Sequence, residues 1–217
     1  MALAALPRRD EMSRAHLEDV GRRSQAFVLA WERAVSLSGE LERLVPGGAL
    51  TRGSVLRVDG GGATSVAYEL AAAVTAIGEW VTAVDLEGTL GALAARETGV
   101  ALDRFAVVRR VPPSRWATVI AALLDGTSLV LVEVPRGINA GDARRLTARA
   151  REREAILVVC SPPERWQAGA ALTFVAESRA WDGPEEVGFL TRRALAVRVE
   201  GHGAAARPRV GELARAV

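Results

Sequence analysis

A strand, a glycine loop and a helix follow one another over residues 54–74, and this unit constrains the fold more than any other part of the chain. Residues 54–58 are an apolar strand, residues 60–62 are three consecutive glycines, and apolar residues then recur at helical spacing. A glycine-rich turn between a strand and a helix is typical of nucleotide-binding α/β units. The unit therefore predicts an α/β protein with an open sheet.

The glycine loop lacks the lysine of a phosphate-binding loop. Such loops read G-x-x-x-x-G-K-[ST], with the lysine on the terminal phosphates and the hydroxyl on Mg²⁺. Here Gly62-Ala63-Thr64 stands where Gly-Lys-Thr is expected, and the loop before it is shorter. All 28 basic residues of the chain are arginines, so no lysine can come from elsewhere. We expect a degenerate remnant made of Gly60, Gly61, Gly62, Ala63 and Thr64, and no ATP hydrolysis.

Strands and helices alternate after the glycine loop. Apolar strands are expected at 80–84, 105–109, 128–132 and 156–160, with helices between them. This alternation predicts a mostly parallel sheet that binds ligands at the carboxyl ends of its strands.

Acidic residues follow two of these strands. Asp85 and Glu87 come after one strand and Glu133 ends another, so they should converge with the glycine loop at one edge of the sheet. In a phosphate-binding site, Glu87 would orient a water molecule and Glu133 would hold Mg²⁺.

Two other interpretations of the loop stay open. Residues 60–65 read G-x-G-x-x-S, and Asp85 lies about twenty residues further on, where a dinucleotide-binding site has its ribose-binding acid. The third glycine of that pattern is missing. The structural alternative is a tight turn formed by three glycines, with the acids capping neighbouring helices.

Cysteine and histidine content argues against a metal centre or a bound cofactor. Cys160 is the single cysteine, which excludes a disulfide framework and a thiolate zinc site. The two histidines, His16 and His202, lie in no metal-binding motif. The net charge of +2 is too small to indicate nucleic-acid binding. Neither a cleavable signal nor a membrane-spanning run is recognisable, so we expect a cytoplasmic protein.

Three parts are expected along the chain: an amino-terminal part over 1–40 with an amphipathic helix at 10–38, a core over 41–200 and a flexible tail over 201–217. After two prolines at 162–163, amphipathic strands at 172–177 and 190–200 predict an antiparallel extension. The candidates for binding a partner are two aromatic side chains of the helix and two cationic side chains of the tail: Phe27, Trp31, Arg207 and Arg209.

Three blocks over residues 41–160 resemble the RecA core. Residues 41–53, with their P-G-G turn, look like the segment that leads RecA proteins into their phosphate-binding strand. Residues 84–104 resemble the stretch D-A-E-x-x-L…G-V-x-x-D, which puts Glu87 at the catalytic glutamate position. Residues 129–133 look like a Walker B strand in which Glu133 replaces aspartate. The resemblance implies a RecA-like core with a mostly parallel central sheet, an amino-terminal helix and an antiparallel carboxyl-terminal extension.

By its size, its P-G-G turn, its degenerate loop and its tryptophan-containing segment within residues 165–183, the chain is identified as a member of the ImuA family of translesion mutasome accessory proteins, in the actinobacterial ImuA-prime branch. This resemblance implies a non-catalytic adaptor in SOS-induced mutagenic translesion DNA synthesis. Its implied partner is the polymerase-like ImuB subunit, and through it a replicative-type translesion polymerase and the β clamp. RecA is a further candidate partner, and direct DNA contact stays open. The alternatives are a modulator of RecA filaments and an NAD-binding Rossmann-type enzyme.

Overall fold

An eight-stranded sheet forms the centre of the computed structural model, which describes residues 34–182 and 192–216. All neighbouring strands from β8 to β5 are parallel, whereas β8, β9 and β10 are antiparallel. From edge to edge the order is β10 (Arg209–Ala216), β9 (Arg192–Gly201), β8 (Leu172–Asp182), β3 (Val55–Asp59), β7 (Ile156–Cys160), β6 (Leu129–Glu133), β4 (Val81–Asp85) and β5 (Phe105–Arg109). The mostly parallel α/β sheet with an antiparallel carboxyl-terminal part is therefore confirmed.

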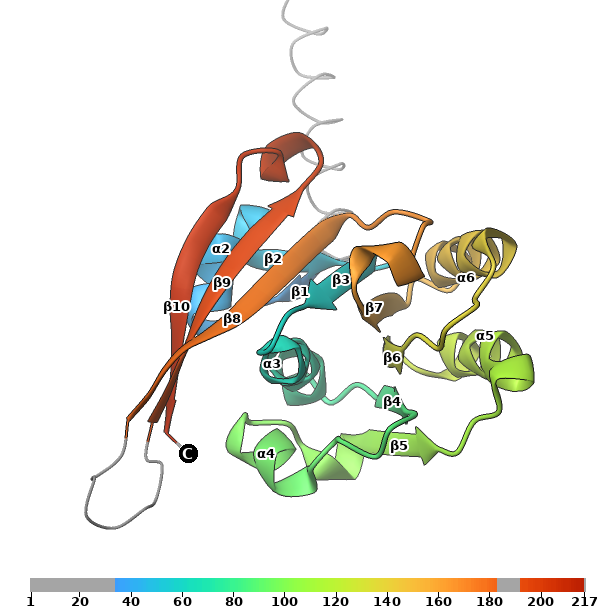
Figure 1. Cartoon of the computed structure of the whole chain (residues 1–217), viewed down its shortest axis with the longest axis horizontal. Coiled ribbons are helices and arrows are strands. Elements are labelled where there is room, and N and C mark those ends of the chain that lie inside the picture. Colours follow the sequence, from blue (N-terminus) through green and yellow to red (C-terminus); the bar gives the residue numbers. More distant parts are fainter. Residues whose placement is uncertain (1–33, 183–191, 217) are drawn as a thin grey trace, which may run out of the picture. The chain divides into compact units, whose positions relative to one another are not determined.

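Helices cover both faces of the parallel strands. In Figure 1, α3 and α4 lie on one side of the central strands, and α5 and α6 lie together on the other. Each side has its own apolar core. Because both of their faces are covered, β4 is buried at all five positions and β6 at four of its five. The helices are α2 (Gly39–Leu44), α3 (Ala63–Ala76), α4 (Ala92–Glu97), α5 (Trp116–Gly126) and α6 (Ala140–Glu152).

The antiparallel strands are covered by a helix on one face. Leu195, Val197 and Val199 of β9 are buried with α2 and α3, while Arg198 between them is exposed. This alternation is what a sheet with one buried face requires. A small second sheet pairs β1 (Ala34–Ser36) with β2 (Ala49–Thr51).

The carboxyl-terminal segment corrects one prediction. We expected a flexible tail over 201–217, but residues 209–216 form β10 and pair with β9 over eight positions. Leu213 is buried in the core beneath this strand, and Gly211 approaches the side chain of Glu40 on α2. Val210 and Leu213 are the only large apolar residues of β10, so the strand depends on the partner strand that the tertiary fold supplies.

The amino-terminal helix predicted over residues 10–38 is wrong at its carboxyl end, because Ala34–Ser36 form β1 and Val35 is buried in the core. The rest of that helix, with Phe27 and Trp31, lies outside the described residues. The chain divides into two units, Met1–Ala34 and Val35–Val217, and the second contains the whole eight-stranded sheet.

Within residues 34–182 and 192–216, no helix combines the length and the apolar character needed to cross a bilayer.

Candidate functional site

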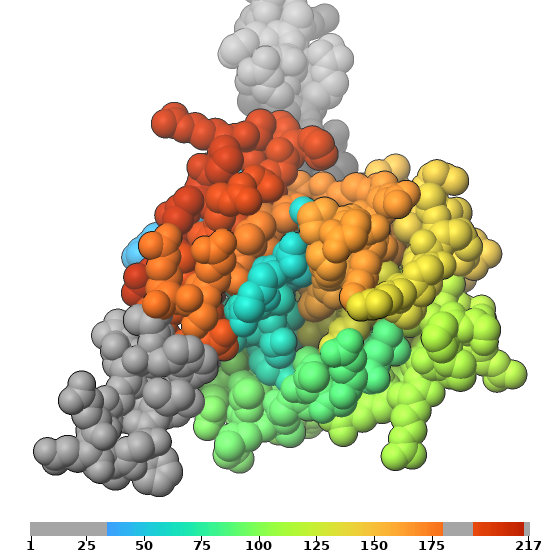
Figure 2. All heavy atoms as spheres, viewed as in Figure 1, coloured from blue at the N-terminus to red at the C-terminus, as the bar shows by residue number. Residues whose placement is uncertain are grey.

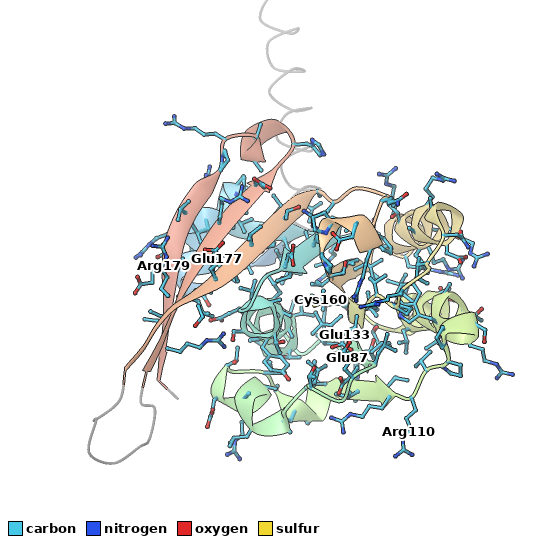
Figure 3. All side chains as sticks on the ribbon, viewed as in Figure 1. Glu87, Arg110, Glu133, Cys160, Glu177 and Arg179 are labelled. Atoms are coloured by element: carbon cyan, nitrogen blue, oxygen red, sulfur yellow. The ribbon has the colours of Figure 1, made fainter. Side chains whose placement is uncertain are left out.

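The carboxyl ends of β3, β4, β6 and β7 meet at one edge of the sheet, as predicted. In the register of these strands, Cys160 lies between Val58 of β3 and Glu133 of β6. Figure 3 shows Cys160, Glu133 and Glu87 close together near the middle of the view, whereas Glu177 and Arg179 lie far away on β8. The structure therefore brings the predicted acids into one neighbourhood.

Glu133 holds the loop that follows β4. Its Oε2 accepts hydrogen bonds from the backbone N–H groups of Leu86 (2.6 Å) and Glu87 (3.2 Å), and its Oε1 accepts one from the hydroxyl of Thr89 (3.3 Å). The indole N–H of Trp116 fixes the backbone at the same position by donating to the Glu133 carbonyl oxygen. The carboxylate that was predicted to hold Mg²⁺ instead accepts hydrogen bonds from the loop after β4.

Asp85 organises the same loop from the other side. Its Oδ1 accepts from the backbone N–H groups of Gly88 and Thr89, and its Oδ2 accepts from Leu90 and from the guanidinium of Arg109 at 2.9 Å. The residue is 1 % exposed. A ribose-binding acid needs a carboxylate that faces a ligand, so these contacts argue against the dinucleotide interpretation.

Glu87 differs from these two acids, because its side chain is exposed. Its backbone N–H donates to Glu133, and no hydrogen bond or ion pair to its carboxylate is found among the described residues. Glu87 is thus the one predicted acid whose carboxylate faces solvent.

Three backbone N–H groups of the glycine loop donate to acceptors within the protein. The N–H of Gly60 donates to Asp59 Oδ1 (2.7 Å), that of Gly62 to the carbonyl oxygen of Ala176 on β8 (3.1 Å), and that of Ala63 to Gly60 (3.0 Å). A phosphate-binding loop needs several such N–H groups directed at the ligand. The loop therefore lacks a set of unbonded N–H groups for a phosphate, and it also lacks the lysine.

Two of the glycines are required by close packing of the loop against the strands beside it. A Cβ atom at Gly60, where φ is +91°, would lie 2.3 Å from the carbonyl oxygen of Ala176. One at Gly62 would lie 2.8 Å from Leu195 of β9. Figure 2 shows the loop in cyan bordered by the orange atoms of β8. This packing supports the structural alternative for the three glycines.

Arg193 of β9 also contacts the glycine loop, although it was not among the site residues predicted from the sequence. Its Nη2 donates to the carbonyl oxygen of Gly61 at 2.8 Å. No local sequence pattern indicates this contact, because 132 residues separate the two partners.

A cleft of about 550 Å³ opens beside Glu87 and Glu133. Arg136 and Arg165 contribute cationic groups, and the glycine loop is not part of its lining. A ligand would therefore meet two guanidinium groups and one exposed carboxylate. The remaining lining residues are mostly apolar: Leu86, Val111, Pro113, Val134, Pro135 and Cys160.

The Cys160 thiol in this cleft is not activated. Burial, assisted by the nearby Glu133 carboxylate, raises the pKa of Cys160 to about 12. A thiol with this pKa is protonated at neutral pH and is a poor nucleophile. The described residues also contain no group of three or more histidine, cysteine or acidic side chains placed to hold a metal ion.

The cationic candidates of the carboxyl-terminal segment lie away from the cleft. Arg207 is exposed in the turn before β10, and the guanidinium of Arg209 donates to the carbonyl oxygen of Arg43 on α2 at 3.3 Å.

Comparison with known proteins identifies one family. The family model described as MT3502 N-terminal domain matches residues 43–168, which include the glycine loop, Asp85, Glu87 and Glu133. No curated protein matches the chain.

Proposed function

The chain belongs to the MT3502 N-terminal domain family, and we propose that this member is a non-catalytic adaptor with a RecA-like core. In this proposal it is the ImuA-prime-type subunit of a cytoplasmic complex for SOS-induced mutagenic translesion DNA synthesis. It binds the polymerase-like ImuB subunit, which in turn contacts a replicative-type polymerase and the β clamp.

The state of the glycine loop is the observation on which the proposal rests. The N–H groups of Gly60, Gly62 and Ala63 already have protein acceptors, and Arg193 donates to the loop from outside. A nucleotide would have to break these bonds and would find no lysine. The loop is consequently better suited to joining β3 and α3 to the strands beside them than to binding phosphate.

Strand arrangement supports the RecA-like interpretation. The strand that precedes the glycine loop, β3, lies in the interior of the sheet between β7 and β8. The glutamate at the position of the Walker B acid ends β6, and the loop with Glu87 follows the adjacent β4. Two of the three sequence blocks that resemble RecA, residues 84–104 and 129–133, thus begin and end on neighbouring strands.

The test is to measure ATP hydrolysis by the full-length protein, with and without single-stranded DNA, together with binding to purified ImuB-type partner. We expect no hydrolysis, and we expect the partner to bind. Ala63→Lys, which restores the missing lysine, should not produce Mg·ATP binding, because the backbone donors stay occupied. DNA-stimulated hydrolysis that is lost in Glu87→Gln would overturn the proposal, and so would failure of the wild-type protein to bind the partner.

A further inference from the structure

Exposed large apolar side chains are concentrated in the segment that leads from α3 to the edge strand β5. Among the described residues, six large apolar side chains are exposed, and five of them belong to the segment from the end of α3 to β5. Leu93 is 58 % exposed and Val107 is 39 % exposed. The other members of this group are Ile77, Trp80 and Leu102, and the sixth exposed side chain is Val210 on β10. A concentration of exposed large apolar side chains in one segment of a folded surface points to an interaction site.

The strand beneath this surface has an open edge. Within the described residues, β5 pairs only with β4, so the other side of its backbone has no partner strand. Unpaired N–H and C=O groups at a sheet edge form a template for an additional strand. Phe105, Val107 and Arg109, at alternate positions of β5, all face a neighbouring cavity.

This cavity has a volume of about 370 Å³ and lies between β5 and the start of α4. Its walls are largely apolar. The ring of Tyr68 packs edge-on against Phe105 with 6.2 Å between the ring centroids, and its hydroxyl donates to the carbonyl oxygen of Gly91. The other lining residues are Leu90, Ala92, Leu102, Val107 and Arg109.

We propose that an extended segment of a partner protein pairs with the open edge of β5 and inserts an apolar side chain into this cavity. Main-chain hydrogen bonds along an edge give affinity in this mode of recognition, and pockets for alternate side chains give specificity. The inference rests on the proposed adaptor function and names the surface through which the partner binds.

Charge indicates the chemistry of the partner segment. Arginines flank β5 at both ends: Arg104 precedes it, and Arg109 and Arg110 end it. Arg104 lies over the Trp80 ring and makes a long ion pair of 3.9 Å with the exposed Asp103. Arg109 remains 53 % exposed despite its ion pair with Asp85, and no ion pair of Arg110 is found among the described residues. An apolar strand with acidic residues at its flanks complements this edge.

A second copy of this chain fits less well. Its own edge strand β10 begins with Arg209. Because arginines flank β5 at both ends, pairing of β10 with β5 in either direction brings Arg209 close to one of them, and like charges on neighbouring strands are destabilising.

The experiment compares Val107→Glu with Val210→Glu in binding of the purified ImuB-type partner. Both changes put a carboxylate at an exposed valine of an edge strand, so Val210→Glu is the matched control. We expect Val107→Glu to weaken binding by about tenfold or more, as at a central interface residue, and Val210→Glu to leave it unchanged. Thermal denaturation checks that both variants are folded.

A photo-cross-linking amino acid at position 107 provides an independent measurement. We expect it to attach to one extended segment of the partner with acidic flanks. Equal binding by wild type and Val107→Glu would overturn this inference alone, and cross-linking to a second copy of the chain would overturn the choice of partner. No binding by the wild-type protein would overturn the adaptor function and this inference together.

Discussion

The carboxylate of Glu133 accepts a hydrogen bond from the backbone N–H of Leu86 at 2.6 Å. This contact joins the end of β6 to the loop after β4 and uses the carboxylate that was predicted from the sequence to hold Mg²⁺. The same carboxylate also binds Glu87 N–H and the Thr89 hydroxyl. Glu133 therefore has a structural role here.

Replacing Glu133 with alanine should destabilise the protein. The change removes three hydrogen bonds to a charged acceptor, and we expect the free energy of unfolding to fall by about 2 kcal/mol in urea denaturation. Glu87→Ala is the control, because its exposed carboxylate has no partner among the described residues, and it should change stability by less than about 0.5 kcal/mol. Equal losses in both variants would contradict the role of Glu133.

Two alanine substitutions in the glycine loop should differ in their effect on stability, because only one of them introduces a steric clash. A methyl group at Gly62 would approach Leu195 to 2.8 Å and Ala176 to 3.0 Å, so Gly62→Ala should lower the free energy of unfolding by about 1–2 kcal/mol. At the adjacent Gly61 no atom lies within 4 Å of an added Cβ, and Gly61→Ala should be neutral. A stable Gly62→Ala variant would show that the loop does not pack tightly on β8 and β9.

Strand β10 provides another matched pair. Leu213 is 7 % exposed and belongs to the core, so Leu213→Ala should lower the free energy of unfolding by about 2–3 kcal/mol. Val210, three residues earlier in the same strand, is 65 % exposed, and Val210→Ala should have little effect. If chemical denaturation showed both changes to be neutral, residues 201–217 would behave as the flexible tail that the sequence suggested.

The Cys160 thiol should react slowly in the folded protein. Its pKa is raised from 9.0 to about 12, so at pH 8 the thiolate fraction is about a thousandfold lower than in the unfolded chain. Ellman's reagent should label the urea-unfolded protein far faster than the native protein. Similar rates in both states would contradict the elevated pKa.

The raised pKa of Cys160 also predicts how the stability of the protein changes at alkaline pH. Below about pH 9 the thiol is protonated in both states and contributes no pH dependence. Between about pH 9 and 12 the unfolded chain releases this proton first, so the free energy of unfolding should fall as pH rises. Cys160→Ser, compared with wild type by urea denaturation across this range, should remove that part of the decrease.

The parallel part of the fold could be predicted because its signals are local. Buried strands such as β4 and β6 are short apolar runs, and the glycines at 60–62 mark a turn whatever surrounds them. The rule that ligands meet the carboxyl ends of parallel strands then placed Glu87 and Glu133 in one neighbourhood without knowledge of the strand order.

Predictions failed where an element depends on distant partners. The segment that forms β10 has weak strand character of its own and is held by β9 and by α2. The cavity beside β5 and the contact of Arg193 with Gly61 likewise join residues far apart in the chain. No local periodicity encodes such contacts.

The sequence by itself determined that the glycine loop has no lysine and that a strand and a helix flank it, because residue identity and periodicity are local properties. Only the tertiary structure decided what the loop does instead. The N–H of Gly62 donates to Ala176 on β8, and its missing side chain leaves room for Leu195 on β9. Both partners lie more than a hundred residues away, so the sheet alone brings them to the loop.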